Sequence, residues 1–134
     1  MAGMSVRRVG YLLVLASALA RGGDFQTPAI TAQALAGLRG TAGEPLIVDV
    51  RSFGEYKAGH VPGAINIPTG ELEARSADLR DAAQGVVLYC TRGERTLQAE
   101  EILLDHRIVN LLHLEGGLGG WLASGQRLSA GWEP

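Results

Sequence analysis

Short apolar runs alternate with segments of helical spacing along residues 29–134. The runs, each rich in Val, Ile or Leu, are residues 46–50, 64–68, 86–89 and 109–114. The helical segments are residues 31–38, 52–56, 71–83 and 96–106, with a last one opened by Gly116 and Gly117. This alternation predicts an α/β domain with a mostly parallel sheet covered by helices on both faces. In such sheets, chemistry is expected where the strands end.

The first twenty residues have a different character. Arg7 and Arg8 precede an uncharged run over residues 9–20, which closes on Ala18-Leu19-Ala20. This pattern predicts a signal peptide over 1–20, followed by a linker over 21–28 and the domain over 29–134. The run is shorter than the roughly 18 residues of a spanning helix, so we expect no stable membrane insertion after cleavage. A packed N-terminal helix and an uncleaved anchor stay open as alternatives.

Composition narrows the class of protein. With 134 residues, 46% of them apolar, the chain is long enough for one packed domain. A net charge of −2 gives no basic surface, so we expect no nucleic-acid partner. The single cysteine rules out an internal disulfide and a cysteine-rich zinc site, and three histidines without metal spacing predict no metal. A lone thiol in a periplasmic or secreted protein indicates a function for that thiol.

That cysteine, Cys90, ends the apolar run 86–89. A polar loop with Arg92, Gly93 and Arg95 follows, and Thr96 is a good cap for the next helix. This order is expected to direct backbone N–H groups and a helix N-terminus at the thiol, which favours the thiolate. Cys90 is therefore a candidate nucleophile.

Three motifs then identify a family resemblance. They are Asp49-Val50-Arg51 with Glu55-Tyr56 and residues 59–68, then residues 90–96, and finally Leu114-Glu115-Gly116-Gly117 with Gly120-Trp121. In this order they resemble a single-domain rhodanese of the sulfurtransferase family. The resemblance implies a rhodanese-like three-layer α/β fold and a double displacement. Cys90 would take a sulfane sulfur from thiosulfate or a persulfide and pass it to cyanide, a thiol or a protein acceptor, without metal or organic cofactor.

The resemblance also assigns roles within the loop. The substrate-binding residues would be Thr91, Arg92, Gly93, Glu94, Arg95 and Thr96, whose N–H groups over 91–95 would stabilise the thiolate and the persulfide. Arg95 would close the loop or only hold its shape. Arg92 would face solvent and the arriving anion, while Glu94 either disfavours very anionic donors or is a solvated charge.

Outside the loop, Arg51 is expected either to bind substrate near the pocket or to pair with Glu55. Asp49 and His60 are expected to give structural support. On the helix after the loop, the spacing predicts that Glu100 and Glu101 face water. His106 and His113 are expected to be packed or exposed residues rather than catalysts.

Loop length separates the related chemistries. Four residues stand between Cys90 and Arg95. Related cell-cycle phosphatases and arsenate reductases have five, which gives a wider cradle for a tetrahedral oxyanion. The shorter loop favours a persulfide sulfur. A non-catalytic persulfide carrier for a partner protein stays open, and a phosphatase-like enzyme or arsenate reductase is the third reading.

Overall fold

The computed structural model describes residues 25–134, so the predicted signal peptide 1–20 and residues 21–24 of the linker lie outside it. The strands are β1 (Ala29–Ile30), β2 (Leu46–Asp49), β3 (Ile65–Asn66), β4 (Val86–Tyr89) and β5 (Leu111–Leu114). The helices are α2 (Ala32–Leu38), α3 (Phe53–Ala58), α4 (Leu72–Arg75), α5 (Ala77–Arg80), α6 (Glu94–Asp105) and α7 (Gly117–Ala123), with a 3₁₀ turn, η1, at Thr69–Glu71.

The strands form one parallel sheet in the order β1-β5-β4-β2-β3. Strand β4 lies at its centre, and all four of its side chains are buried, which explains why its sequence is continuously apolar. In the register of β2 with β4, Asp49 is the partner of Tyr89. The segments that begin at Val50 and Cys90 therefore leave the sheet side by side at its carboxyl edge.

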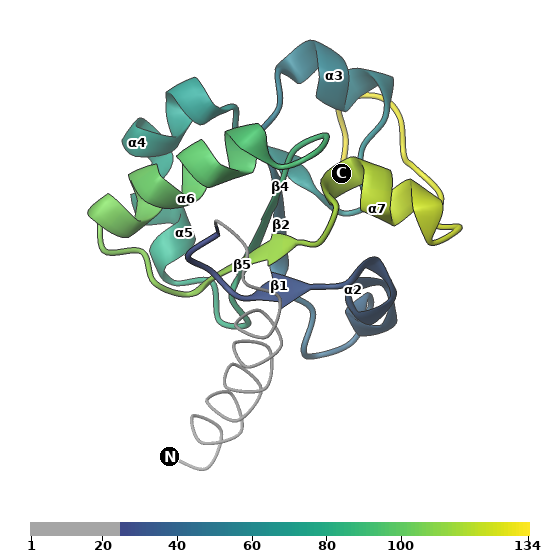
Figure 1. Ribbon diagram of the computed structural model, residues 1–134, viewed down its shortest axis with the longest axis horizontal. Coiled ribbons are helices and arrows are strands. Elements are labelled where there is room, and N and C mark those ends of the chain that lie inside the picture. The colour runs from purple at the N-terminus through teal and green to yellow at the C-terminus, as the bar shows by residue number, and fades with distance from the viewer. Residues whose placement is uncertain (1–24) are drawn as a thin grey trace.

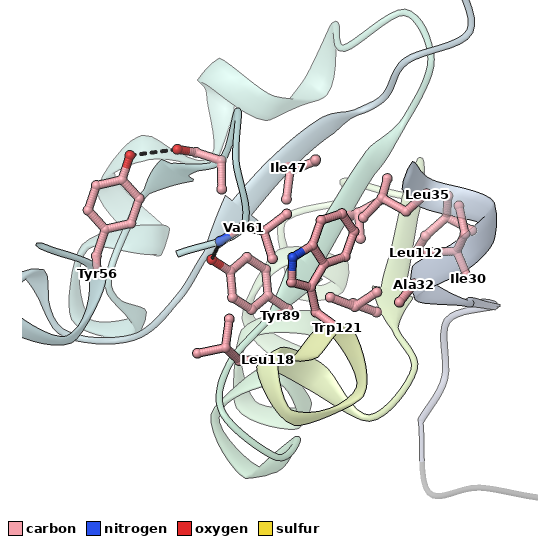
Figure 2. Close-up of a cluster of buried hydrophobic side chains, with 13 residues drawn as sticks. Ile30, Ala32, Leu35, Ile47, Tyr56, Val61, Tyr89, Leu112, Leu118 and Trp121 are labelled. Carbon is pink, nitrogen blue, oxygen red and sulfur yellow. Dashed lines mark hydrogen bonds between the residues drawn. The ribbon is translucent and has the colours of Figure 1, made fainter. Parts of the chain in front are cut away.

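Helices cover both faces of the sheet, as the sequence predicted (Figure 1). Helices α4, α5 and α6 lie on one face, α2 and α7 on the other, and α3 stands beyond the carboxyl edge. Figure 2 shows the apolar cluster on the α2 and α7 face, where Trp121 lies beside Leu35 and Tyr89. The opposite face is filled by a second cluster that includes Leu88, Cys90 and Leu103. Each face therefore has its own apolar core.

The predicted helices 71–83 and 96–106 differ most clearly from the structure. In place of the helix expected over 71–83, α4 and α5 follow the turn η1 and end at Arg80. The break between α4 and α5 falls at Ser76, whose hydroxyl donates to the Glu73 carbonyl (3.0 Å) and competes with the helical ladder. The helix expected to start at Thr96 begins at Glu94, and its N-cap is Gly93. Thr96 therefore lies inside the first turn and is not a cap.

The N-terminal side of the domain holds two further differences. Strand β1 was not expected, because two residues are too short to give a periodic signal; it pairs with β5. Residues 25–28 lie in the predicted linker, yet Thr27 is buried and donates to Glu100. The prediction that Glu100 faces water is wrong, since the residue is 2% exposed. Its carboxylate is covered by the segment that precedes β1.

The buried imidazole of His113 gives the fold a pH dependence. Burial lowers the pKa of His113 from 6.5 to about 4. In the unfolded chain the imidazole takes up a proton near pH 6.5, but in the folded chain only near pH 4. The stability that neutral His113 contributes is therefore fully present above pH 6.5 and is lost as the pH falls from 6.5 to 4. We expect this group alone to lower the free energy of unfolding by about 3 kcal/mol. Urea unfolding of wild type and His113→Gln at several pH values measures it; equal pH slopes would contradict it.

Candidate active site

Cys90 stands directly after β4 and is completely buried. It belongs to the apolar cluster on the α6 face, together with Val50 and Leu88. Within residues 25–134 the structure records no hydrogen bond to its sulfur. The predicted ring of N–H groups over 91–95 around the thiol therefore stays a prediction. The sulfur is covered by surrounding residues in this structure.

The main chain around Cys90 is fixed by α7. The N–H of Leu118 donates to the Cys90 carbonyl (2.9 Å), and that of Gly119 to the Thr91 carbonyl (3.3 Å). Gly117 has a φ of +59°, and a Cβ there would stand 2.6 Å from the Cys90 oxygen and 2.8 Å from the Thr91 oxygen. Only glycine fits so close an approach, which explains the Gly116-Gly117 motif physically.

The loop is closed by an ion pair with α3. The Arg95 guanidinium contacts the Glu55 carboxylate through two bonds, of 2.6 and 3.0 Å, and lies 3.3 Å from the Thr91 hydroxyl. The pair lowers the pKa of Glu55 from 4.5 to about 2, chiefly through the hydrogen bond from Arg95. The same bond raises the pKa of Arg95. Arg95 therefore joins the loop to α3 through a carboxylate.

The other loop residues divide by exposure. Arg92 and Glu94 are exposed, and no ion pair is recorded for either within the described part of the chain. Gly93 adopts a φ of +146°, which a residue with a side chain rarely accepts. Thr96 is buried, and its hydroxyl has no recorded hydrogen-bond partner in residues 25–134. Arg92 is therefore the loop cation that faces solvent.

Asp49 and Arg51 form a buried pair at the end of β2. The Arg51 guanidinium donates to both Asp49 carboxylate oxygens (2.7 to 3.1 Å) and to the Gly59 carbonyl (2.6 Å). The predicted pairing of Arg51 with Glu55 is wrong, because Glu55 pairs with Arg95. The Tyr89 hydroxyl donates to Asp49 at 2.7 Å. Burial raises the pKa of Tyr89, and the Asp49 charge raises it further, so the hydroxyl keeps its proton.

His60 follows Gly59, whose carbonyl accepts a hydrogen bond from Arg51. It is buried, its ring stacks on Tyr56 with centroids 3.7 Å apart, and its Nδ1 lies 2.8 Å from the Tyr56 carbonyl. The Tyr56 hydroxyl donates to the Ala64 carbonyl at 2.6 Å, as Figure 2 shows. The two rings thus brace the turn between α3 and β3, which agrees with the structural support expected of His60.

Glu55 is the site residue whose role the sequence left undecided. Ser52 caps α3, and Glu55 completes a capping box by reaching back to the Ser52 backbone. The Ser-x-x-Glu spacing therefore places Glu55 in the first turn of a helix that follows β2. What the spacing does not tell is which arginine this carboxylate meets.

Two classes of feature are absent from residues 25–134. No helix there is long and apolar enough to cross a membrane. No group of three or more His, Cys, Asp or Glu side chains is placed there to hold a metal ion.

The Asp49–Arg51 pair should dominate the stability of this edge. Asp49→Asn leaves a buried guanidinium without its counter-charge, so we expect the free energy of unfolding to fall by about 3 kcal/mol. Urea unfolding followed by tryptophan fluorescence measures it. Asp78→Asn is the matched control, because it breaks the exposed pair of Asp78 with Arg75 and should change little. Equal effects of the two substitutions would contradict a central role for Asp49.

Known proteins share both the sequence and the shape of this domain. The Rhodanese-like domain profile matches residues 31–124. An HTH-type transcriptional regulator of Mycobacterium tuberculosis is 39% identical over 95 residues, which are 69% of this chain and 41% of that protein. A tRNA uridine(34) hydroxylase of Hamiltonella defensa is 36% identical over 80 residues, 56% of this chain and 22% of that protein. The chain thus spans less than half of these curated relatives.

Solved structures agree with the sequence matches. A thiosulfate sulfurtransferase from Pseudomonas aeruginosa superposes with a TM-score of 0.70 at 30% identity, over 93% of this chain and 23% of that one. A rhodanese-related protein from Thermoplasma volcanium superposes with a TM-score of 0.65 at 28% identity, over 78% of this chain and 98% of that one. With the profile match over most of its length, the chain belongs to the rhodanese-like domain family.

Proposed function

We propose that this protein is a sulfurtransferase, which moves a sulfane sulfur from thiosulfate or a persulfide to a thiophilic acceptor through a persulfide on Cys90. The observation that carries the proposal is the loop after β4. It begins with a cysteine thiol and closes, after four intervening residues, on Arg95, which is held by Glu55. The likeness to a thiosulfate sulfurtransferase supports the same chemistry.

The reaction proceeds in two displacements. The Cys90 thiolate attacks the outer sulfur of thiosulfate, a sulfur–sulfur bond forms at Cys90, and the bond to sulfite breaks with its electron pair on sulfite. Cyanide or a thiolate acceptor then attacks the outer persulfide sulfur, and Cys90 leaves as the thiolate. Charge balances in both steps, and neither step needs an external oxidant or reductant. The N–H groups over 91–95 would stabilise the persulfide.

The charges around the loop set how the donor arrives. Arg51 is paired with Asp49, and Arg95 is paired with Glu55. Arg92 is exposed and has no recorded ion-pair partner within residues 25–134, so it is the cation best placed to attract an anionic donor. Glu94, two residues on and also exposed, limits that attraction.

Replacing the nucleophile tests the proposal directly. Cys90→Ser should abolish transfer from thiosulfate to cyanide while the fold stays intact, because a serine hydroxyl is not ionised near neutral pH. After exposure to thiosulfate, the wild type should gain about 32 Da, the mass of one sulfur carried by the covalent intermediate, and the variant should not. Mass spectrometry and circular dichroism provide the two readings. Transfer by a folded Cys90→Ser protein would refute the proposal.

Arg92 gives a second test. Arg92→Gln should raise KM for thiosulfate about threefold, leave kcat unchanged and flatten the dependence of kcat/KM on salt. Arg75→Gln is the matched control, since it removes an exposed arginine from α4, outside the loop. Steady-state rates at low and high ionic strength measure both. The role assigned to Arg92 fails if the two variants behave alike.

A persulfide carrier is the second candidate function. The complete burial of Cys90 favours it, because a closed loop would protect a bound sulfur until a partner protein collects it. A carrier releases about one sulfur per chain and then stops, whereas an enzyme turns over. The number of thiocyanate molecules formed per protein chain separates the two.

A phosphatase or arsenate reductase is disfavoured by the four residues between Cys90 and Arg95, which make a narrower loop than those enzymes have. Hydrolysis of an aryl phosphate would contradict this.

We propose export as a periplasmic or secreted protein, with cleavage after Ala20 as the pattern of residues 1–20 predicts. N-terminal sequencing of protein from the native host should find Arg21 first. A cytosolic protein that starts at Met1 would contradict export.

A further inference from the structure

Residues 25–27 lie against the loop, α6 and β5; we call them the strap. The Phe25 ring stacks on the His113 ring, with centroids 3.8 Å apart and planes 13° apart. The tip of the same ring is 3.1 Å from the position that a Cβ would take at Gly93. The ring of Phe25 therefore occupies the space beside Gly93 that a side chain at this position in the loop would take.

The strap is anchored to a buried carboxylate. The backbone N–H of Gln26 donates to one Glu100 oxygen and the Thr27 hydroxyl to the other, each at 2.7 Å. The Thr27 hydroxyl has a single proton, which it donates to Glu100. It therefore accepts at its 3.0 Å contact with Nδ1 of His113, and this ring nitrogen is the one that carries an N–H. Within residues 25–134, both recorded hydrogen-bond partners of the Glu100 carboxylate come from the strap. A buried carboxylate needs such donors, so the strap is held firmly in place.

This anchoring bears on the loop because of where Gly93 stands. Gly93 lies between Cys90 and Arg95, caps α6, and has no side chain of its own to restrain it. Arg95 fixes the loop on the α3 side through Glu55. On the other side, the Phe25 ring lies where a side chain at Gly93 would stand, so the loop lies between an ion pair and an aromatic ring.

We infer that Phe25 is a positioning residue for the Cys90–Arg95 loop, which it holds closed over the thiol through Gly93. The inference rests on the proposed function for its kinetic consequence alone. Without the ring, the loop opens more often and returns less accurately to the geometry of sulfur transfer. Donor attraction by Arg92 does not depend on this contact, so the loss should appear in kcat rather than in KM.

The first readout is independent of sulfur transfer. Cys90 is the single cysteine of the chain and is fully buried, so its alkylation by iodoacetamide reports loop opening. In the full chain, Phe25→Ala should speed alkylation about fivefold, and Phe25→Leu should restore most of the protection. The control is Val109→Ala, which truncates an exposed apolar side chain. Val109 precedes β5 and so lies at the amino ends of the strands, away from the loop at their carboxyl ends. This substitution should leave the rate unchanged.

The second readout is steady-state transfer from thiosulfate to cyanide. Phe25→Ala should lower kcat about tenfold, with KM within about twofold of wild type, because small misplacements of reacting groups cost large factors in rate. Thr27→Val separates positioning from stability: it removes an anchor of the strap but keeps the ring. We expect it to lower the thermal midpoint more than Phe25→Ala and kcat less.

The outcomes are distinct. The inference is overturned if folded Phe25→Ala alkylates at the wild-type rate, or if kcat merely follows the thermal midpoint across Phe25→Ala and Thr27→Val. If the wild type transfers no sulfur while Phe25→Ala still speeds alkylation, the proposed function fails and the positioning of the loop stands.

Discussion

The carboxylate of Asp49, buried at the end of β2, is the charge on which the carboxyl edge of the sheet depends. A lone ion in that position would be strongly destabilising, so its partners are fixed as firmly as the ion itself. Arg51 neutralises it and also donates to the Gly59 carbonyl, which ties in the end of α3. Tyr89 donates to it and accepts from the Val61 N–H, which ties in the following turn. Since Tyr89 immediately precedes Cys90, the position of the nucleophile follows from that of Asp49.

Around this fixed edge, the loop after Cys90 is held by contacts of three different kinds. Peptide N–H groups of α7 hold its first two carbonyls, an ion pair holds Arg95, and an aromatic ring lies beside Gly93. The hydrogen bonds from α7 are short-range and insensitive to salt. The ion pair of Arg95 is half exposed and screened by salt, and the packing of the aromatic ring is apolar. The start of the loop is therefore more rigidly held than its middle, as a site that must admit a donor to a buried sulfur requires.

The sequence predicted what depends on local pattern. The buried runs around β2 and β4, the thiol at the end of β4 and the glycines that open α7 all leave a signal within a few residues, and each is confirmed. It did not predict what depends on distant partners. Glu100 looked solvent-exposed because the donors that bury it come from residues 26 and 27, more than seventy positions earlier. Two arginines and two acids near one edge allow more than one pairing, and spacing alone cannot choose between them.

The close approach of Gly117 to the carbonyls of Cys90 and Thr91 also bears on how this domain can vary. At 2.6 Å from the Cys90 oxygen, a single added methyl group would push on the peptide that carries the thiol. A change of sequence far along the chain would thus be felt at the sulfur, while the loop itself kept every residue. A related sequence that keeps the cysteine loop does not for that reason alone keep the geometry of the loop. It must also keep the small residues of α7.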